Sequence, residues 1–224
     1  MRKQPLLTDN YYHIYNRGVD KRDIFGDVSD IYRFAESIKG FNRIDKIMSL
    51  SNLKKHQSFK QIAPEALSEP ELLVEVVAYC LNPNHFHFIL KQSIDGGIAK
   101  FMQKLQAGYT SYFNIKNCRS GVLFQGAFKS QIIANENYFN KIIGYVNKNY
   151  LIHNITDNKK NLILSGDKEY ENNNFKIISK IESHRILEVF GDSKKFKKHC
   201  DEIVEAIKEE RGERSLLEDE EIPR

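Results

Sequence analysis

The segment "LNPNHFHFIL", residues 81–90, places His85 and His87 two positions apart in an apolar stretch. On a β-strand, residues i and i+2 point to the same face, so both imidazoles would project together while Phe86 and Phe88 fill the core. Imidazole nitrogens are common ligands for divalent metals. Two ligands do not make a site, and a pair of half-exposed sheet histidines is an equally plain interpretation. A metal centre is therefore predicted only if a third ligand and a reactive group lie nearby.

The segment "ENYFNKIIGYVNKNY", which begins at Glu136, has the periodicity of a helix and supplies such candidates. One side carries the packing stripe Phe139, Ile143, Val146 and Tyr150. Tyr145 and Asn149 are i and i+4, so their side chains are expected to be neighbours. Tyr138 falls on the same side, and Lys141 and Lys148 flank it, which predicts a solvent-facing stripe. The plain alternative is a boundary tyrosine with lysines that keep the helix soluble.

The remaining elements should position these residues. Strands are predicted over residues 10–19, 72–81 and 85–90, and a further strand within "RSGVLFQGAFKSQII". One helix is predicted to begin after a cap at Asp27 or Ser29, a second to span residues 98–116, and a third to begin after a cap at Asn135. Residues 44–70 read as an irregular connection. Strands that alternate with helices favour a compact α/β sandwich.

Charge and cysteine use narrow the class of protein. Residues 1–155 hold 20 Lys and Arg against 13 Asp and Glu, and residues 91–148 alone hold 8 against 2, so the middle of the chain is basic and suits a polyanion. The three cysteines form no CxxC pair, which favours reduced thiols in a cytoplasmic protein. No membrane span or secretory signal is expected.

The composition changes near residue 155. Residues 156–224 are rich in Asn and Lys, then in acidic residues, and contain two predicted short helices broken at Gly191-Asp192 and a frayed acidic tail. We therefore expect one domain over 1–155 and a C-terminal extension over 156–224.

Four segments in order resemble a known family. "NPNHFHFIL" resembles the HUH motif, histidine-hydrophobic-histidine, and "YFNKIIGYVNKN" resembles the tyrosine helix of single-tyrosine HUH transposases. "YYHIYNRGVDKRDIF" and "GVLFQGAFKSQII" are similar to the opening strand and to the segment before the tyrosine helix. The resemblance runs from about residue 9 to 155 and is to the IS200-like superfamily, in particular its REP-associated tyrosine transposase branch. One departure is Tyr150, where many relatives have proline after the asparagine.

The resemblance implies an α/β (α+β) fold, a ferredoxin-like or RRM-like sandwich with a central antiparallel sheet and helices packed on it. It implies Tyr145 as the nucleophile and His85, His87 and Asn149 as ligands of Mg²⁺ or Mn²⁺. Tyr138 is the competing tyrosine, but Ile142 stands at its i+4 position.

The activity implied is cleavage and strand transfer of single-stranded, hairpin-forming DNA through a 5′-phosphotyrosine, with no nucleotide cofactor, by a nucleoid-associated monomer or homodimer. The sequence names no general base. The expected DNA contacts are Arg17, Lys100, Lys104, Lys129, Lys141 and Lys148. One alternative is a domesticated hairpin-binding protein with little or no cleavage. A second is a metal-dependent phosphoesterase that uses water and forms no covalent adduct, but such sites usually need more carboxylates, and no Asp or Glu lies between Asp95 and Glu136. A third is an RNA-binding ferredoxin-like domain, which would need exposed aromatic residues where this strand has histidines.

Overall fold

A five-stranded antiparallel sheet forms the centre of the protein, seen in a computed structural model that describes residues 5–44, 71–153 and 155–214. The strands are β1 (Tyr11–Arg17), β2 (Val74–Asn82), β3 (His85–Gln92), β4 (Lys129–Ile132) and β5 (Leu164–Ser165). Their order across the sheet is β4-β1-β3-β2-β5. The predicted fold class is confirmed, while the connection expected over 44–70 lies almost entirely outside the described residues.

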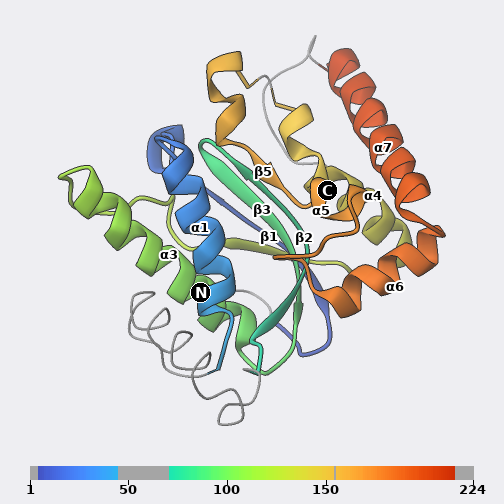
Figure 1. The fold of residues 1–224 in the computed structure, drawn as a ribbon, viewed down its shortest axis with the longest axis horizontal. Helices are drawn as coiled ribbons and strands as arrows, with labels where there is room; N and C mark the ends of the chain where they lie inside the picture. Colours follow the sequence, from blue (N-terminus) through green and yellow to red (C-terminus); the bar gives the residue numbers. More distant parts are fainter. Residues whose placement is uncertain (1–4, 45–70, 154, 215–224) are drawn as a thin grey trace.

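Helices cover both faces of this sheet (Figure 1). The α-helices are α1 (Val28–Phe41), α3 (Gly97–Lys116), α4 (Glu136–Asn147), α5 (Asp167–Glu171), α6 (Lys180–Phe190) and α7 (Ser193–Arg214). Short 3₁₀ turns are η1 (Val19–Lys21), η3 (Asn149–Leu151) and η4 (Asp157–Leu162). Helices α1 and α3 pack together on one face, and α4 packs on β2 and β3 from the other.

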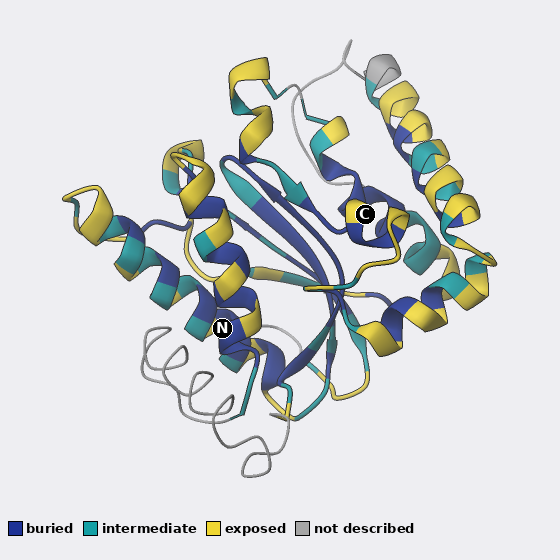
Figure 2. Ribbon diagram, in the orientation of Figure 1, coloured by how far each residue is buried: buried dark blue, intermediate teal, exposed yellow. Residues whose placement is uncertain are grey.

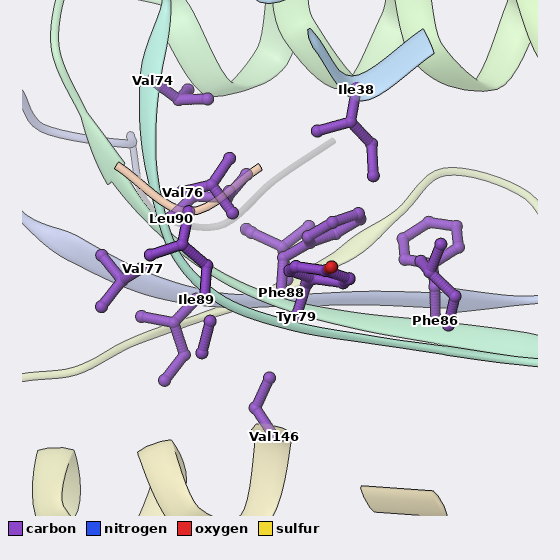
Figure 3. Packing of buried hydrophobic residues seen from close by; sticks show 14 of the residues in the cluster. Ile38, Val74, Val76, Val77, Tyr79, Phe86, Phe88, Ile89, Leu90 and Val146 are labelled. Atoms are coloured by element: carbon purple, nitrogen blue, oxygen red, sulfur yellow. The ribbon is translucent and has the colours of Figure 1, made fainter. Parts of the chain in front are cut away.

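Alternation along β3 explains this two-sided core. Phe86 and Phe88 are fully buried, and the ring of Phe86 lies 5.6 Å from that of Phe34 in α1. Figure 3 shows Ile38 of α1 and Val146 of α4 on opposite sides of the strands. The odd-numbered residues of β3, which include both histidines, therefore face the α4 side.

Local capping fixes where the helices begin. Asp27 accepts from the backbone of Asp30, whose side chain returns a bond to Asp27, so a capping box starts α1. Asn135 accepts from the backbone of Tyr138 and starts α4, as the sequence predicts. The predicted end of α4 is wrong: the helix stops at Asn147, and Asn149 opens the 3₁₀ turn η3.

The C-terminal extension builds part of the same core. Strand β5 pairs with β2, and α7 packs along α4. Phe196, Cys200 and Ile207 of α7 are buried in the main hydrophobic cluster, and Figure 2 shows the buried side of α7 turned toward α4. Helix α7 has 22 residues, so the prediction of two short helices is wrong for the second. Among the described residues, no helix is long and apolar enough to cross a membrane.

Candidate active site

The β2–β3 hairpin presents the two histidines. A two-residue turn, Pro83-Asn84, joins the strands, and the carbonyl of Pro83 accepts from the backbone of Ile24 and Phe25, which anchors the turn. The rings of His85 and His87 stand 5.2 Å apart on the same face and are perpendicular to each other. The prediction that the two imidazoles project together therefore agrees with the geometry of β3.

Asn149 meets His85 at the end of this hairpin. Oδ1 of Asn149 lies 3.0 Å from Nε2 of His85, and Asn149 is fully buried. Nδ2 of Asn82 lies 2.8 Å from Asn149 Oδ1 and 2.9 Å from His85 Nε2. One amide group of β2 thus bridges two of the predicted ligands.

The hydrogen bonds around His85 determine its tautomer. Nδ1 of His85 lies 2.6 Å from Oδ1 of Asn84, and a carboxamide oxygen can only accept, so Nδ1 carries the hydrogen. Nε2 is then an acceptor that points at Asn82 and Asn149. A partner that fixes the ring in this way is typical of histidines that bind metals.

His87 is held by His13 of β1. Nε2 of His13 lies 2.9 Å from Nδ1 of His87, and the two rings are nearly parallel. His13 is fully buried, and burial lowers its pKa to about 3; burial also lowers the pKa of His87 well below its usual value, with the neighbouring histidines acting in the same direction. Both imidazoles are therefore neutral at physiological pH, the form that binds metals.

We expect His13 to make stability depend on pH. Its pKa is about 3 when folded and about 6.5 when unfolded, so the unfolded chain binds one more proton between these values. Its contribution is complete above pH 6.5 and is lost as pH falls toward 3, about 2 kcal/mol of it by pH 5. Urea unfolding at pH 7 and pH 5, with chelator, should show a smaller loss in His13→Gln than in the wild type. Equal losses would contradict the assignment.

Tyr145 of α4 completes the cluster. Its ring stands edge-on to His87 at 5.5 Å and to His13 at 6.1 Å. Burial raises the pKa of Tyr145 to about 12, whereas Arg211 and the nearby amide of Asn149 act to lower it. The phenol thus lies beside the amide of Asn149, although these two residues are separated by the end of α4.

The competing tyrosine, Tyr138, is placed differently. Its hydroxyl is buried with no hydrogen-bond partner, and burial, then the nearby Tyr15, raises its pKa. Among the described contacts, the tyrosine rings that pair with His13 and His87 are those of Tyr15 and Tyr145. Geometry therefore favours Tyr145 over Tyr138 as the group beside the histidines.

The predicted solvent-facing stripe on α4 is wrong. Tyr145 is 3% exposed and Lys148 6%, because α7 lies over this side of the helix. Lys148 is ion-paired with Asp201, and Lys141 lies 3.7 Å from Glu210. Gly144 permits the close approach, since a Cβ there would stand 3.0 Å from the Cβ of Ile203.

The predicted DNA contacts fall into separate groups. Arg17 lies opposite His85 on β1, and Lys129 of β4 lies opposite Tyr15, so both belong to the site face. Lys100 and Lys104 lie on α3, across the sheet, where their amines donate to the carbonyls of Ile44 and Arg43. The structure does not bring these two lysines to the histidines.

Sequence reasoning missed three residues that hold the cluster in place. Asn82 and Asn84 flank a proline, which is typical of a turn, and His13 stands among aromatic residues of a predicted strand, so the sequence predicts none of the three as a site residue. A signal for His13 existed: Tyr11, His13, Tyr15 and Arg17 alternate along one strand and so share a face. The neighbour of this strand depends on the order of strands in the sheet, and the local pattern of residues does not specify that order.

The donor set fits a divalent cation. Two acceptors, His85 Nε2 and Asn149 Oδ1, converge to 3.0 Å, and the amide hydrogens of Asn82 stabilise them. A cation at this point would satisfy the same two acceptors with a full positive charge in place of the partial positive charge of the amide hydrogens, and His87 offers a second neutral imidazole. Nitrogen and oxygen ligands together suit Mn²⁺ somewhat better than Mg²⁺.

Comparisons with known proteins match the part of the chain that contains these residues. Residues 44–149 match the family described as "Transposase IS200 like", and this span contains both histidines, Tyr145 and Asn149. Over this segment the chain is similar to the IS200-like transposase family, in agreement with the resemblance seen in the sequence.

One solved structure that matches is described as "Structure of the REP associates tyrosine transposase bound to a REP hairpin". It is 12% identical with a TM-score of 0.47, and the match covers 80% of this chain and 89% of that one. No curated protein matches the chain significantly.

Proposed function

We propose that this protein cleaves and rejoins single-stranded DNA through a covalent bond to Tyr145. The match to the IS200-like transposase family supports transposase-like chemistry on DNA. The observation that carries the assignment to these residues is the convergence of His85 Nε2 and Asn149 Oδ1 at 3.0 Å, with the ring of Tyr145 at 5.5 Å from that of His87. A nucleophile and a cation site thus lie side by side, as transfer of a phosphodiester requires.

His85, His87 and Asn149 would hold the metal. When bound, a divalent ion supplies positive charge to a non-bridging phosphate oxygen and so makes the phosphorus more electrophilic. The protein contributes orientation: Asn84 directs Nε2 of His85 to the site. A hydrogen bond donated by Nδ1 of His87 to Nε2 of His13 would leave Nε2 of His87 for a ligand.

The proposed reaction is a transesterification, in which one phosphate ester bond forms as another breaks. The oxygen of Tyr145 attacks phosphorus, the bond to the 3′ oxygen of the upstream fragment breaks, and the phosphate links Tyr145 to the 5′ end of the downstream fragment. The phenol loses one proton and the leaving 3′ oxygen gains one. A 3′ hydroxyl of the same or another strand can reverse the step, so joining needs no nucleotide cofactor.

The burial of Tyr145 favours a second candidate, a hairpin-binding relative with little or no cleavage. A nucleophile must approach its target atom to about 3–3.5 Å, and an oxygen of a residue that is 3% exposed is poorly placed for this. Binding of gene-flanking DNA without any adduct would support this candidate.

A labelled-strand assay tests the proposal. Single-stranded DNA from both flanks of the gene is incubated with the protein and Mn²⁺, carrying one dye at the 5′ end and another at the 3′ end. We expect only the 3′-end dye to migrate with denatured protein, because the phosphate on the downstream fragment is bound to Tyr145. The signal should disappear with chelator. Two free fragments and no adduct would instead indicate hydrolysis by water.

A further inference from the structure

A tyrosine and a lysine extend the site toward one edge of the sheet. Tyr15 of β1 lies directly opposite His87 of β3 on one side and Lys129 of β4 on the other. Directly paired residues of antiparallel strands point to the same face, so all three share the face that carries the predicted metal ligands. The rings of Tyr15 and His87 are 5.6 Å apart and within 17° of parallel.

The amine of Lys129 stands over this tyrosine. Its Nζ lies 5.7 Å from the centre of the Tyr15 ring, within the range of a cation–π contact. The ring of Tyr15, which is half-buried, also stacks on His13 at 4.9 Å. Neighbouring rings therefore hold the tyrosine in one orientation while Lys129 places positive charge next to it.

This side of the site lies at an edge of the sheet. Strand β4 is the last in the sheet, and Lys129 and Ile132 are exposed while Ser130 and Gln131 are half-buried. On the opposite side, η3 and β5 lie against β2, and α7 packs on α4. A strand of DNA whose phosphate lies at the histidines would therefore pass over Tyr15 and Lys129.

We propose that Tyr15 and Lys129 form a nucleobase-stacking subsite, which holds a nucleotide adjacent to the scissile phosphate of single-stranded DNA. The subsite rests on the proposed function, because it takes the histidines as the place of the phosphate. A fixed aromatic ring beside a cation is the combination by which proteins hold single strands: the base stacks on the ring, and the amine pairs with the backbone. This arrangement tolerates any base, since every base has a π-face.

The test separates stacking from charge. Fluorescence anisotropy measures the affinity of the protein, in chelator, for a thymidine homopolymer and for an abasic chain of equal length. We expect the abasic chain to bind wild type roughly tenfold more weakly or worse. Tyr15→Leu should lose most of this preference, and Tyr15→Phe should keep it. Lys129→Met should weaken both chains alike and lower the salt slope by roughly one.

Tyr32→Leu is the matched control. Tyr32 lies on α1 and is 61% exposed, so its loss should leave the preference for bases unchanged. The subsite is excluded if Tyr15→Leu keeps the wild-type preference, if Tyr15→Phe loses it, or if neither chain binds. A failure of the proposed function would give a different result. The protein would still bind the thymidine chain more tightly than the abasic chain through Tyr15, but no covalent adduct would form.

Discussion

Tyr145→Phe is expected to abolish the covalent protein–DNA adduct, a loss of roughly a thousandfold or more in the rate of its formation. The ring of Tyr145 stands edge-on to His87 and His13, and its hydroxyl lies beside Asn149. Phenylalanine keeps the ring and deletes only the oxygen that would attack phosphorus. The measurement is the band of labelled DNA that remains with protein on a denaturing gel.

Tyr138→Phe provides the matched control on the same helix. Its hydroxyl is buried without a hydrogen-bond partner, so removing it should cost little stability and leave the adduct intact. Tyr145→Phe should lower stability by only about 1 kcal/mol, which a thermal melt can check. If the adduct persists in Tyr145→Phe and is lost in Tyr138→Phe, the nucleophile has been assigned to the wrong tyrosine.

Sequence analysis predicts best the structural features that depend on residues close together along the chain. The alternation in "HFHFIL" predicts that His85 and His87 share a face, and the cap at Asn135 predicts the start of α4. Each depends on a local rule of backbone geometry. The same holds for the sheet and its helices, whose existence follows from apolar periodicity.

What the sequence does not reveal depends on partners far along the chain. His13 meets His87 only because β1 pairs with β3 in one register, 74 residues away. Tyr145 and Lys148 are polar on a helix surface and so read as solvent-facing, but α7 covers them from the C-terminal extension. A helix with a mostly polar sequence gives little local sign of which face it will bury.

The end of α4 shows how a correct expectation can rest on incomplete reasoning. Tyr145 and Asn149 were expected to be neighbours because they are i and i+4 on one helix. The helix stops at Asn147, and Lys148 leaves helical geometry before the 3₁₀ turn begins. Asn149 still reaches the site, because Asn82 of β2 holds its oxygen at 2.8 Å. Tertiary contacts, and not helical spacing alone, place this side chain.

Asn149→Leu is expected to weaken Mn²⁺ binding roughly a hundredfold and to slow adduct formation by a similar factor. Leucine has nearly the shape of asparagine but removes the oxygen that converges with His85 Nε2 at 3.0 Å. Changes to residues that merely support metal ligands cost roughly 10- to 100-fold in affinity, so losing a ligand should cost at least the upper figure. Calorimetric titration of Mn²⁺ without DNA measures the first effect directly.

Asn147→Leu is the control for burial and helix position. Asn147 is also fully buried, two residues earlier, but its amide donates to the carbonyl of Ile143 within α4 and faces no histidine. It should bind Mn²⁺ like the wild type. Excess Mn²⁺ should partly restore the adduct in Asn149→Leu, because weak binding can be overcome by mass action whereas a distorted fold cannot. Normal Mn²⁺ affinity in Asn149→Leu would show that the cation, if bound, is held by other residues.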